Sequence, residues 1–171
     1  IEPTGVRMQD GTFHELDTLI LATGFHADRF IRPTTVLGAG GVSLDSIWER
    51  RPTAYLAVTL PGFPNFFMLN GPTGPVGNFS LIDIAERQWT YIDQLIERLR
   101  GGVARAVVPT QAAFDDYETR RIDAAKKTIF GSGCTSWYLD DEGVPATWPW
   151  SYDAFAEAMA APVMKDYALI A

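Results

Sequence analysis

Residues 80–100 read SLIDIAERQWTYIDQLIERLR and form the clearest element in the sequence. Apolar side chains recur there at every third or fourth position, which is the spacing of one face of an α-helix. Ser80, or Asn78 just before it, can cap the start, and Gly101-Gly102 ends the pattern. We therefore predict an amphipathic helix over residues 80–100. Its expected buried stripe consists of Leu81, Ile82, Ala85, Trp89, Ile92, Leu95, Ile96 and Leu99.

The chain before this helix is rich in signals for short strands and turns. Residues 6–13 predict a hairpin with its turn at residues 9–12. The nearly continuous apolar run 16–21 is typical of a core strand covered on both faces, and residues 66–69 predict a second short buried strand. Frequent Pro and Gly between residues 25 and 64 leave room only for short strands, turns and a single helical turn.

A second helix is expected after residue 109. Thr110 can cap a helix that runs to about Phe130, and Gly131 follows as the stop. Residues 136–139 predict an aromatic strand, and residues 152–160 predict a last short helix. The inward residues expected on the second helix are Phe114, Tyr117, Ala125 and Ile129.

Composition limits the classes of function. The chain has 171 residues, of which 47% are hydrophobic, so one domain or a large piece of one is expected. A formal net charge of -7 argues against a nucleic-acid partner, because phosphate binding needs clustered Lys and Arg. No apolar run is long enough to span a membrane. Cys134 is the single cysteine and no zinc-ligand spacing occurs, so we expect no metal site and a reducing, cytoplasmic setting.

Two segments could lie against a cofactor. The run 17–25 ends in Ala22, Thr23 and Gly24, whose small side chains would let a ligand approach the backbone, although a plain strand-to-loop turn fits as well. The loop 70–80 leads into the long helix, whose free N-H groups and dipole can stabilise anionic oxygens. An ordinary capped helix packed on a sheet is the alternative there.

Several motifs occur together in one order. They are DTLILATGF at 17–25, GGVSLDSIW at 40–48, AYL at 54–56, GFPNFFM at 62–68, NGP at 70–72 and ERQ at 86–88. In this order they resemble flavin-dependent monooxygenases of the Baeyer-Villiger kind, from residue 1 to about residue 150. The resemblance implies an α/β fold: the C-terminal part of a Rossmann-like, two-domain FAD/NAD(P)-binding flavoprotein, with short mixed strands and two main helices.

The resemblance also implies a division of the chain. Residues 1–25 would be the end of the NADPH-binding domain and the crossover strand. Residues 26–130 would be the C-terminal part of the FAD-binding domain, and residues 131–171 a loop and small helix that cover the active site.

The same resemblance assigns cofactor and substrate residues. It places Thr23, Gly24, Gly71, Pro72 and Leu81 at FAD. It places Ala22 and Trp137 at NADPH, although Trp137 fits equally well as a core residue of an aromatic strand, and Asn78 on the substrate side. No catalytic residue is identifiable in the chain.

The parent enzyme implied by the resemblance uses NADPH to reduce FAD, takes up O2 and inserts one oxygen atom into a ketone. No G-x-G-x-x-G unit occurs in the chain, whereas the family needs two, so we expect this fragment alone to be inactive. Ala57 stands where the family usually has Gly, and His26 where an acidic residue is common.

Two alternatives to this function remain. One is a sibling enzyme that oxidises nitrogen or sulfur, and the other is a non-catalytic remnant or interaction module. Exposed apolar surface is expected to favour self-association of the isolated piece.

Overall fold

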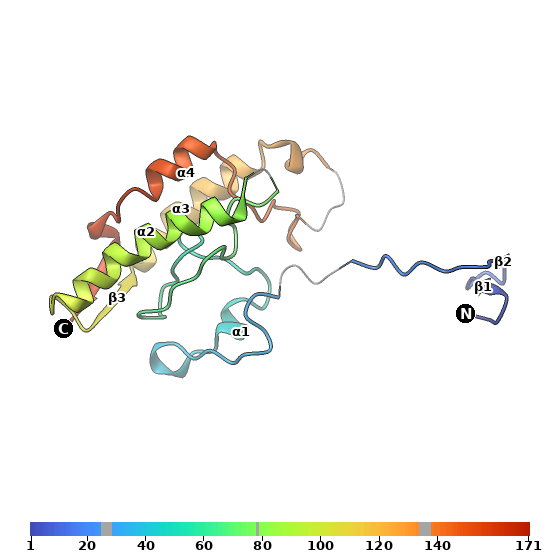
Figure 1. The fold of residues 1–171 in the computed structure, drawn as a ribbon, viewed down its shortest axis with the longest axis horizontal. Helices are drawn as coiled ribbons and strands as arrows, with labels where there is room; N and C mark the ends of the chain where they lie inside the picture. Colours follow the sequence, from blue (N-terminus) through green and yellow to red (C-terminus); the bar gives the residue numbers. More distant parts are fainter. Residues whose placement is uncertain (25–28, 78, 134–137) are drawn as a thin grey trace.

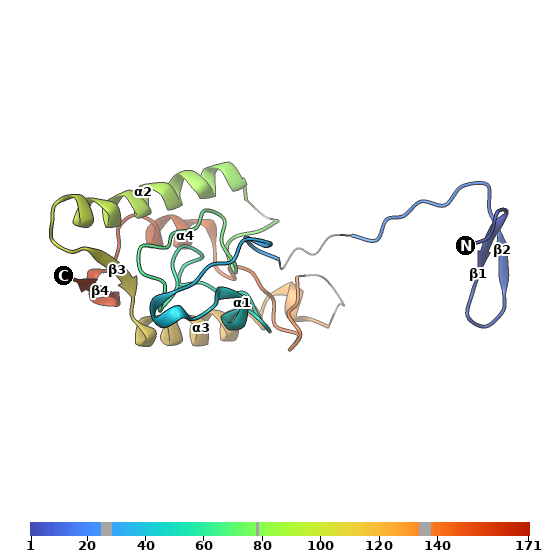
Figure 2. The ribbon, with the colours of Figure 1, turned by 90° about the horizontal axis from the view of Figure 1, so that it is seen from below.

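The computed structural model describes residues 1–24, 29–77, 79–133 and 138–171. Figure 1 shows an extended arm, residues 1–24, that projects away from a larger body. The arm starts with the hairpin of β1 (Gly5–Arg7) and β2 (Phe13–Glu15), paired antiparallel with Val6 opposite His14. This confirms the predicted hairpin. Figures 1 and 2 both show the hairpin well apart from the body.

The segment after the hairpin corrects one prediction. Residues 16–24 are extended but belong to no strand. The side chains of Leu19, Ile20 and Leu21 are 44%, 83% and 72% exposed. A strand requires a neighbour for its backbone N-H and C=O groups, and within the described part of this segment only Leu16 has a backbone partner: its N-H donates to the carbonyl of Thr4 at 3.0 Å. The predicted core strand over residues 16–21, which was expected to be covered on both faces, is therefore wrong in this structure.

The body is built around two helices that flank irregular chain. Helix α2 (Leu81–Arg100) and helix α3 (Gln111–Ala125) lie on opposite sides of the segment 52–77 in Figure 2, and the short α4 (Tyr152–Ala158) lies close to α2. Side chains from all three helices meet in one core. Its buried members are Tyr55, Val58, Ile84, Tyr91, Ile92, Leu95, Val107, Tyr117, Trp148, Phe155, Met159 and Tyr167.

A second strand pair closes one end of the body. Strand β3 (Ala106–Pro109) pairs antiparallel with β4 (Tyr167–Ile170), so that Ala106 faces Ile170. Asn65 occupies the other edge of β3: its N-H donates to the carbonyl of Val107 at 3.0 Å, and its Oδ1 accepts from the N-H of Val107 at 2.9 Å. The sequence did not predict this pair, because the two strands lie far apart in the sequence and no local turn joins them.

Helix α2 has the predicted bounds but a different buried face. Its buried residues are Ile84, Gln88, Tyr91, Ile92 and Leu95. By contrast Leu81, Ile82 and Trp89, all expected inside, are 49%, 75% and 54% exposed. Gln88 and Tyr91 can point inward because each finds a hydrogen-bond partner there, which removes most of the penalty for burying a polar group.

Helix α3 confirms its predicted start and corrects its predicted end. The Thr110 hydroxyl accepts from the N-H of Ala113 at 3.2 Å, as a cap residue does. The helix ends at Ala125 rather than near residue 130, and Ile129, expected inside, is 80% exposed in the 3-10 turn η2 (Ile129–Gly131). Tyr117 and Ala125 are buried as expected.

The remaining short elements agree with the sequence in part. The single helical turn expected between residues 25 and 64 is α1 (Leu44–Ile47), the turn with η1 (Ala39–Gly41) lies in the same stretch, and α4 lies where the pattern predicted a last short helix. The strand predicted at residues 136–139 lies partly outside the described residues, and Leu139 forms only an isolated bridge with Pro145. A further 3-10 turn, η3 (Met164–Asp166), precedes β4. The predicted strand at residues 66–69 does not form: Met68 donates a backbone hydrogen bond to Val58, whereas Phe66 donates only to Phe63, within a local turn.

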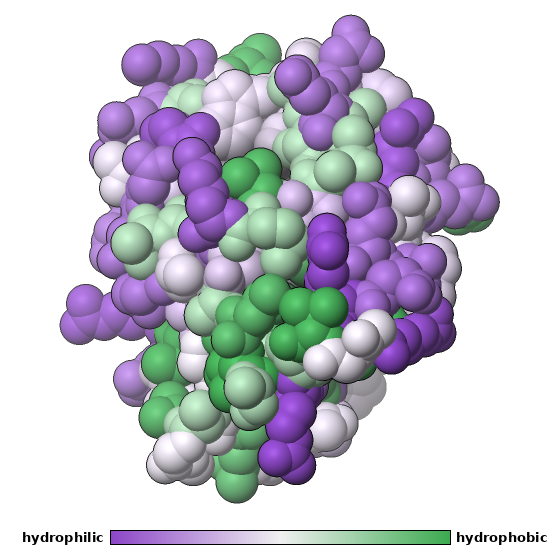
Figure 3. All heavy atoms as spheres, turned by 90° about the vertical axis from the view of Figure 1, so that its left-hand side faces the viewer, coloured by the Kyte–Doolittle hydropathy of each residue, from purple (hydrophilic) through white to green (hydrophobic). Residues whose placement is uncertain are grey.

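The surface is mixed in character. Figure 3 shows polar side chains over much of the upper part of one face, and apolar side chains gathered in its lower part. Among the described residues, no helix has both the length and the apolar character required to cross a membrane. The described residues also contain no cluster of three or more His, Cys, Asp or Glu side chains suited to a metal ion.

Candidate functional site

A hollow of about 520 Å³ lies where the loop 70–77 meets the start of α2. It is lined by residues from four places in the chain: 30–32, 48–52, 70–81 and 138–146. Phe30 and Trp48 form an apolar wall and pack edge to face, with ring centroids 6.2 Å apart. The volume falls within the range of about 300–1,000 Å³ typical of sites for small organic ligands.

The loop beside the hollow is held tightly by the protein itself. Residues 71–75 are buried, and a Cβ added to Gly71 would clash with the carbonyl oxygen of Ala57. A Cβ on Gly74 would lie 3.2 Å from the Cβ of Ala57. The carbonyl of Gly74 accepts from the N-H of Trp148 at 3.1 Å. Packing inside the chain thus requires glycine at position 71 and leaves little room for a side chain at position 74, whether or not a ligand lies nearby.

Gln88 connects this loop to α2. Its side chain is fully buried, accepts from the N-H of Asn70 at 2.6 Å and donates to the carbonyl of Ala57 at 3.4 Å. The Asn70 side chain in turn donates to the carbonyl of Leu81 at 3.2 Å. The loop therefore meets the helix in one fixed arrangement.

One acceptor in this network lacks a donor. The Oδ1 atom of Asn70, a residue that lines the hollow, is buried, and no hydrogen bond to it forms within the described residues. A buried polar atom without a partner costs about 1–3 kcal/mol. The residues present therefore fit a group that brings an N-H donor to this wall, as the pyrimidine ring of a flavin does.

The start of α2 is also available to an acceptor. Ser80 occupies the cap position, but its side chain makes no capping hydrogen bond. The N-H groups of the first helical turn carry partial positive charge, which favours an anionic oxygen placed before them. Asp83 lies in the same turn and its carboxylate accepts from Tyr152, which offsets part of that charge.

The structure brings some of the predicted site residues together. Gly71 and Pro72 are buried in the loop, and Leu81 lines the hollow. Ala22, Thr23 and Gly24 are exposed on the arm, and a Cβ on Gly24 would meet nothing within 4 Å, so they are not packed against the loop. Asn78 and Trp137 lie outside the described residues. The cofactor roles of all these residues stay predictions.

Sequence reasoning missed several residues that shape the hollow. Thr73 is 3% exposed with a φ of 62°, and Ala57 is fully buried with a φ of 59°. The left-handed region favours glycine, which gives a physical reason for the glycine expected at position 57. A polar Gln88 within a helical stripe was a usable signal, because the 3.6-residue period places it on the same side as Ile84, Ile92 and Leu95.

Known proteins match this chain in sequence and in structure. An uncharacterized monooxygenase of Mycobacterium tuberculosis is 42% identical over 151 residues, which are 88% of this chain and 30% of that protein. A Baeyer-Villiger monooxygenase of Streptomyces coelicolor is 33% identical over 164 residues, 94% of this chain and 32% of that protein. No family model matches the chain.

Solved structures give the same result. The cyclohexanone monooxygenase from Rhodococcus sp. Phi1 bound to NADP+ superposes with a TM-score of 0.80 at 30% identity, over 98% of this chain and 33% of that chain. The fold and the matches define a class: the chain corresponds to part of the FAD-binding monooxygenases. Within that class, it is a partial match to the Baeyer-Villiger monooxygenases such as cyclohexanone monooxygenase, and it spans about a third of their length.

Proposed function

We propose that this chain supplies one wall of the FAD site in a Baeyer-Villiger monooxygenase that uses NADPH and O2 to insert one oxygen atom into a ketone. The relatives support the proposal. They include FAD-binding monooxygenases, and the similar solved structures include cyclohexanone monooxygenase bound to NADP+ and cyclohexanone monooxygenase bound to cyclohexanone. The chain spans about a third of these proteins, so the remaining parts of the site belong to polypeptide outside residues 1–171.

The observation that carries the proposal is the wall formed by Asn70 and the start of α2. It presents a buried acceptor to which no described residue donates, next to helix N-H groups that the Ser80 side chain does not cap. A flavin ring has the matching features, because its pyrimidine edge carries both an N-H group and carbonyl oxygens. Bound FAD supplies the electron transfer and the activation of O2, which side chains cannot provide.

The residues of this chain would bind, orient and exclude water. Leu81 and the first turn of α2 would favour negative charge on the flavin, whereas Asn70 would fix the ring through its free acceptor. Phe30 and Trp48 would keep water from the other side of the hollow, which protects a reactive intermediate from side reactions. Asn78 would lie on the substrate side of the flavin, and Ala22 and Trp137 would contact NADPH.

The proposal is tested in the complete protein that carries this sequence. We expect purified protein with the visible absorption of a flavin, and NADPH oxidation that increases when a cyclic ketone is added. With 18O2, one labelled oxygen atom should appear in the lactone product and one in water. A thioether and a tertiary amine serve as comparison substrates, because preferential oxidation of either would favour the sulfur- or nitrogen-oxidising sibling. Colourless protein without flavin would contradict the proposal.

A further inference from the structure

The segment 138–146 forms one side of the hollow and is fastened to the body by two arginines. Tyr138, Leu139 and Asp140 line the hollow from this segment. Arg51 lines it from the segment 48–52. The two segments are about ninety residues apart in sequence, so contacts between them decide whether the hollow has this side at all.

Arg51 is the more exposed of these two arginines. Its Nε lies 2.8 Å from Oδ2 of Asp140, and its Nη2 lies 2.6 Å from Oε2 of Glu142. The Asp140 side chain is only 6% exposed, whereas that of Glu142 is 61% exposed. Breaking an ion pair at an exposed surface costs little, whereas removing the cation from a nearly buried carboxylate costs more, because the carboxylate is left without a partner. The pair with Asp140 is therefore the important one.

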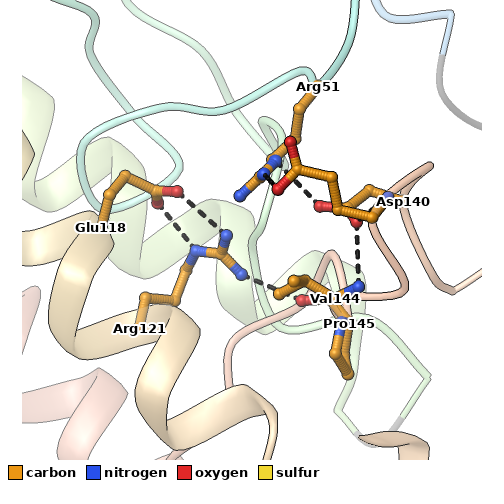
Figure 4. Close-up of polar contacts among 7 residues, drawn as sticks. Arg51, Glu118, Arg121, Asp140, Val144 and Pro145 are labelled. Atoms are coloured by element: carbon orange, nitrogen blue, oxygen red, sulfur yellow. Dashed lines mark hydrogen bonds and ion pairs between the residues drawn. The ribbon is translucent and has the colours of Figure 1, made fainter.

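Asp140 also shapes the turn that Arg51 holds. Its Oδ1 accepts from the N-H groups of Glu142 and Val144, both at 2.9 Å, as Figure 4 shows for Val144. Asp140 thus orders the turn through Oδ1 and forms an ion pair with Arg51 through Oδ2, which is a contact between opposite charges and not an aligned hydrogen bond. Arg51 consequently holds a preformed turn rather than a loose stretch of chain.

Arg121, the second arginine, contacts the segment from inside the body. This side chain of α3 is fully buried and binds both carboxylate oxygens of Glu118, at 2.7 and 2.9 Å. Its Nη1 donates to the carbonyl of Pro145 at 2.9 Å. Figure 4 shows Arg51 and Arg121 reaching the same segment from two different parts of the body.

We propose that Arg51 is a positioning residue: through Asp140 and Glu142 it holds the segment 138–146 across the hollow, and the affinity of the hollow for its ligand depends on this hold. The statement about the ligand rests on the proposed flavin site. Removal of Arg51 leaves the Asp140 carboxylate nearly buried without its cation, which favours release of the turn into water. Arg121 and the core between α2 and α3 are untouched by that change.

The contact between Arg51 and the segment 138–146 is tested first by hydrogen exchange on the complete protein, before FAD is added. In Arg51→Gln we expect the amides of residues 140–146 to exchange about tenfold faster, with the amides of α2 unchanged. Arg51→Lys should restore much of the protection. Arg50→Gln is the matched control, since the neighbouring Arg50 makes no ion pair within the described residues. Unchanged exchange at residues 140–146 in Arg51→Gln overturns the proposal.

A milder variant covers the case in which Arg51→Gln fails to fold. Glu142→Gln removes only the exposed partner and should speed exchange in the same amides by about twofold. Faster exchange spread evenly over the core would instead indicate general destabilisation and would contradict a local hold.

The consequence for the ligand is measured as FAD affinity in the complete protein. We expect Arg51→Gln to raise the Kd for FAD at least fivefold and Arg51→Lys to recover most of the loss, with Arg98→Gln as a charge-matched control on the far turn of α2. Faster exchange with an unchanged Kd overturns the positioning role. Wild-type protein that binds no FAD refutes the flavin site, while the exchange result still decides whether Arg51 holds the segment.

Discussion

Ala57 and the two glycines that pack on it show how closely single residues determine the loop beside the hollow. Ala57 has a left-handed backbone and no exposed surface, and its carbonyl receives a hydrogen bond from Gln88. Gly71 approaches the same carbonyl so closely that no side chain fits between them. The position of the loop relative to α2 therefore depends on atoms that a sequence motif alone does not reveal.

A substitution at Gly71 tests this packing. Gly71→Ala should destabilise the protein by about 2–3 kcal/mol, because the new methyl group must displace the backbone of Ala57 in a closely packed region. Urea unfolding followed by circular dichroism measures the effect.

The control for Gly71 is a glycine in open space. A Cβ added to Gly40 meets nothing within 4 Å, although its φ of 69° adds strain. Gly40→Ala should lower the free energy of unfolding by about 1 kcal/mol, because only backbone strain is added. An equal or larger loss at position 40 would show that the contact with Ala57 is not the controlling factor.

Helix starts differ between the two main elements, although both sequences offer a cap residue. Thr110 accepts a hydrogen bond from the N-H of Ala113 at the start of α3, whereas Ser80 makes no such bond at the start of α2. The difference matters for function, since uncapped N-H groups are the ones a ligand can use.

Alanine at the two cap positions tests this difference. Thr110→Ala should lower the free energy of unfolding by about 1 kcal/mol, because it removes a formed capping bond. Ser80→Ala should change it by less than about 0.5 kcal/mol. Thermal and urea unfolding of both variants give the comparison; a large loss for Ser80→Ala would mean that its hydroxyl does cap α2 in solution.

At this scale the sequence was most informative where an element is long and locally determined. The bounds of α2, the cap of α3, the arm hairpin and α4 follow from periodicity, capping and turn residues. Strands β3 and β4 did not follow, because they form only when residues about sixty positions apart meet. The strand expected over residues 16–21 does not form, because that segment has no partner strand within the described residues. The buried face of α2 was misjudged because apolar Ile82 and Trp89 lie outside while polar Gln88 is paired inside.

The candidate site was predictable only in part for the same reason. Motifs indicated the loop at Gly71 and Pro72 and the start of α2 at Leu81. The opposite side of the hollow comes from Arg51 and the segment 138–146, which are joined by ion pairs between distant residues. Neither periodicity nor local spacing encodes such pairs.

The whole body shares a core rich in buried tyrosine hydroxyls. Burial raises the pKa of Tyr167 to about 12, and burial also raises the pKa values of Tyr55, Tyr91 and Tyr117. Tyr167 and Tyr91 lie hydroxyl to hydroxyl at 2.9 Å. In the unfolded chain these groups titrate near pH 10. The folded protein therefore holds these protons more tightly than the unfolded chain does.

This linkage predicts alkaline unfolding. Stability should be constant with respect to these groups below about pH 10 and should fall as the pH rises from 10 to 12, by about 1.4 kcal/mol per pH unit for each tyrosine that ionises only on unfolding. Tyr167→Phe should make the fall of the unfolding free energy with pH less steep by about 1.4 kcal/mol per pH unit, the contribution of one proton. Urea unfolding at pH 9, 10 and 11 measures it, and a flat profile for the wild type would contradict the burial of these hydroxyls.

Exposed apolar side chains on α2 predict association of the isolated chain. Ile82 and Trp89 are mostly exposed on one part of the helix, and water contact with such a surface favours burial against another molecule. Light scattering of the wild type should show oligomers, and the double variant Ile82→Gln, Trp89→Gln should shift them toward monomer. Val103→Gln changes an exposed apolar residue beyond the C-terminal end of the same helix and is the control; an equal shift there would remove α2 from the interface.

Asn65 has a further consequence for the two-stranded sheet at the end of the body. Its main chain and side chain occupy positions on β3 that the backbone of a neighbouring strand would otherwise use. Fibre growth through sheet edges needs an open edge on both sides of each molecule. With one side of β3 already occupied, stacking through this sheet would end after two copies.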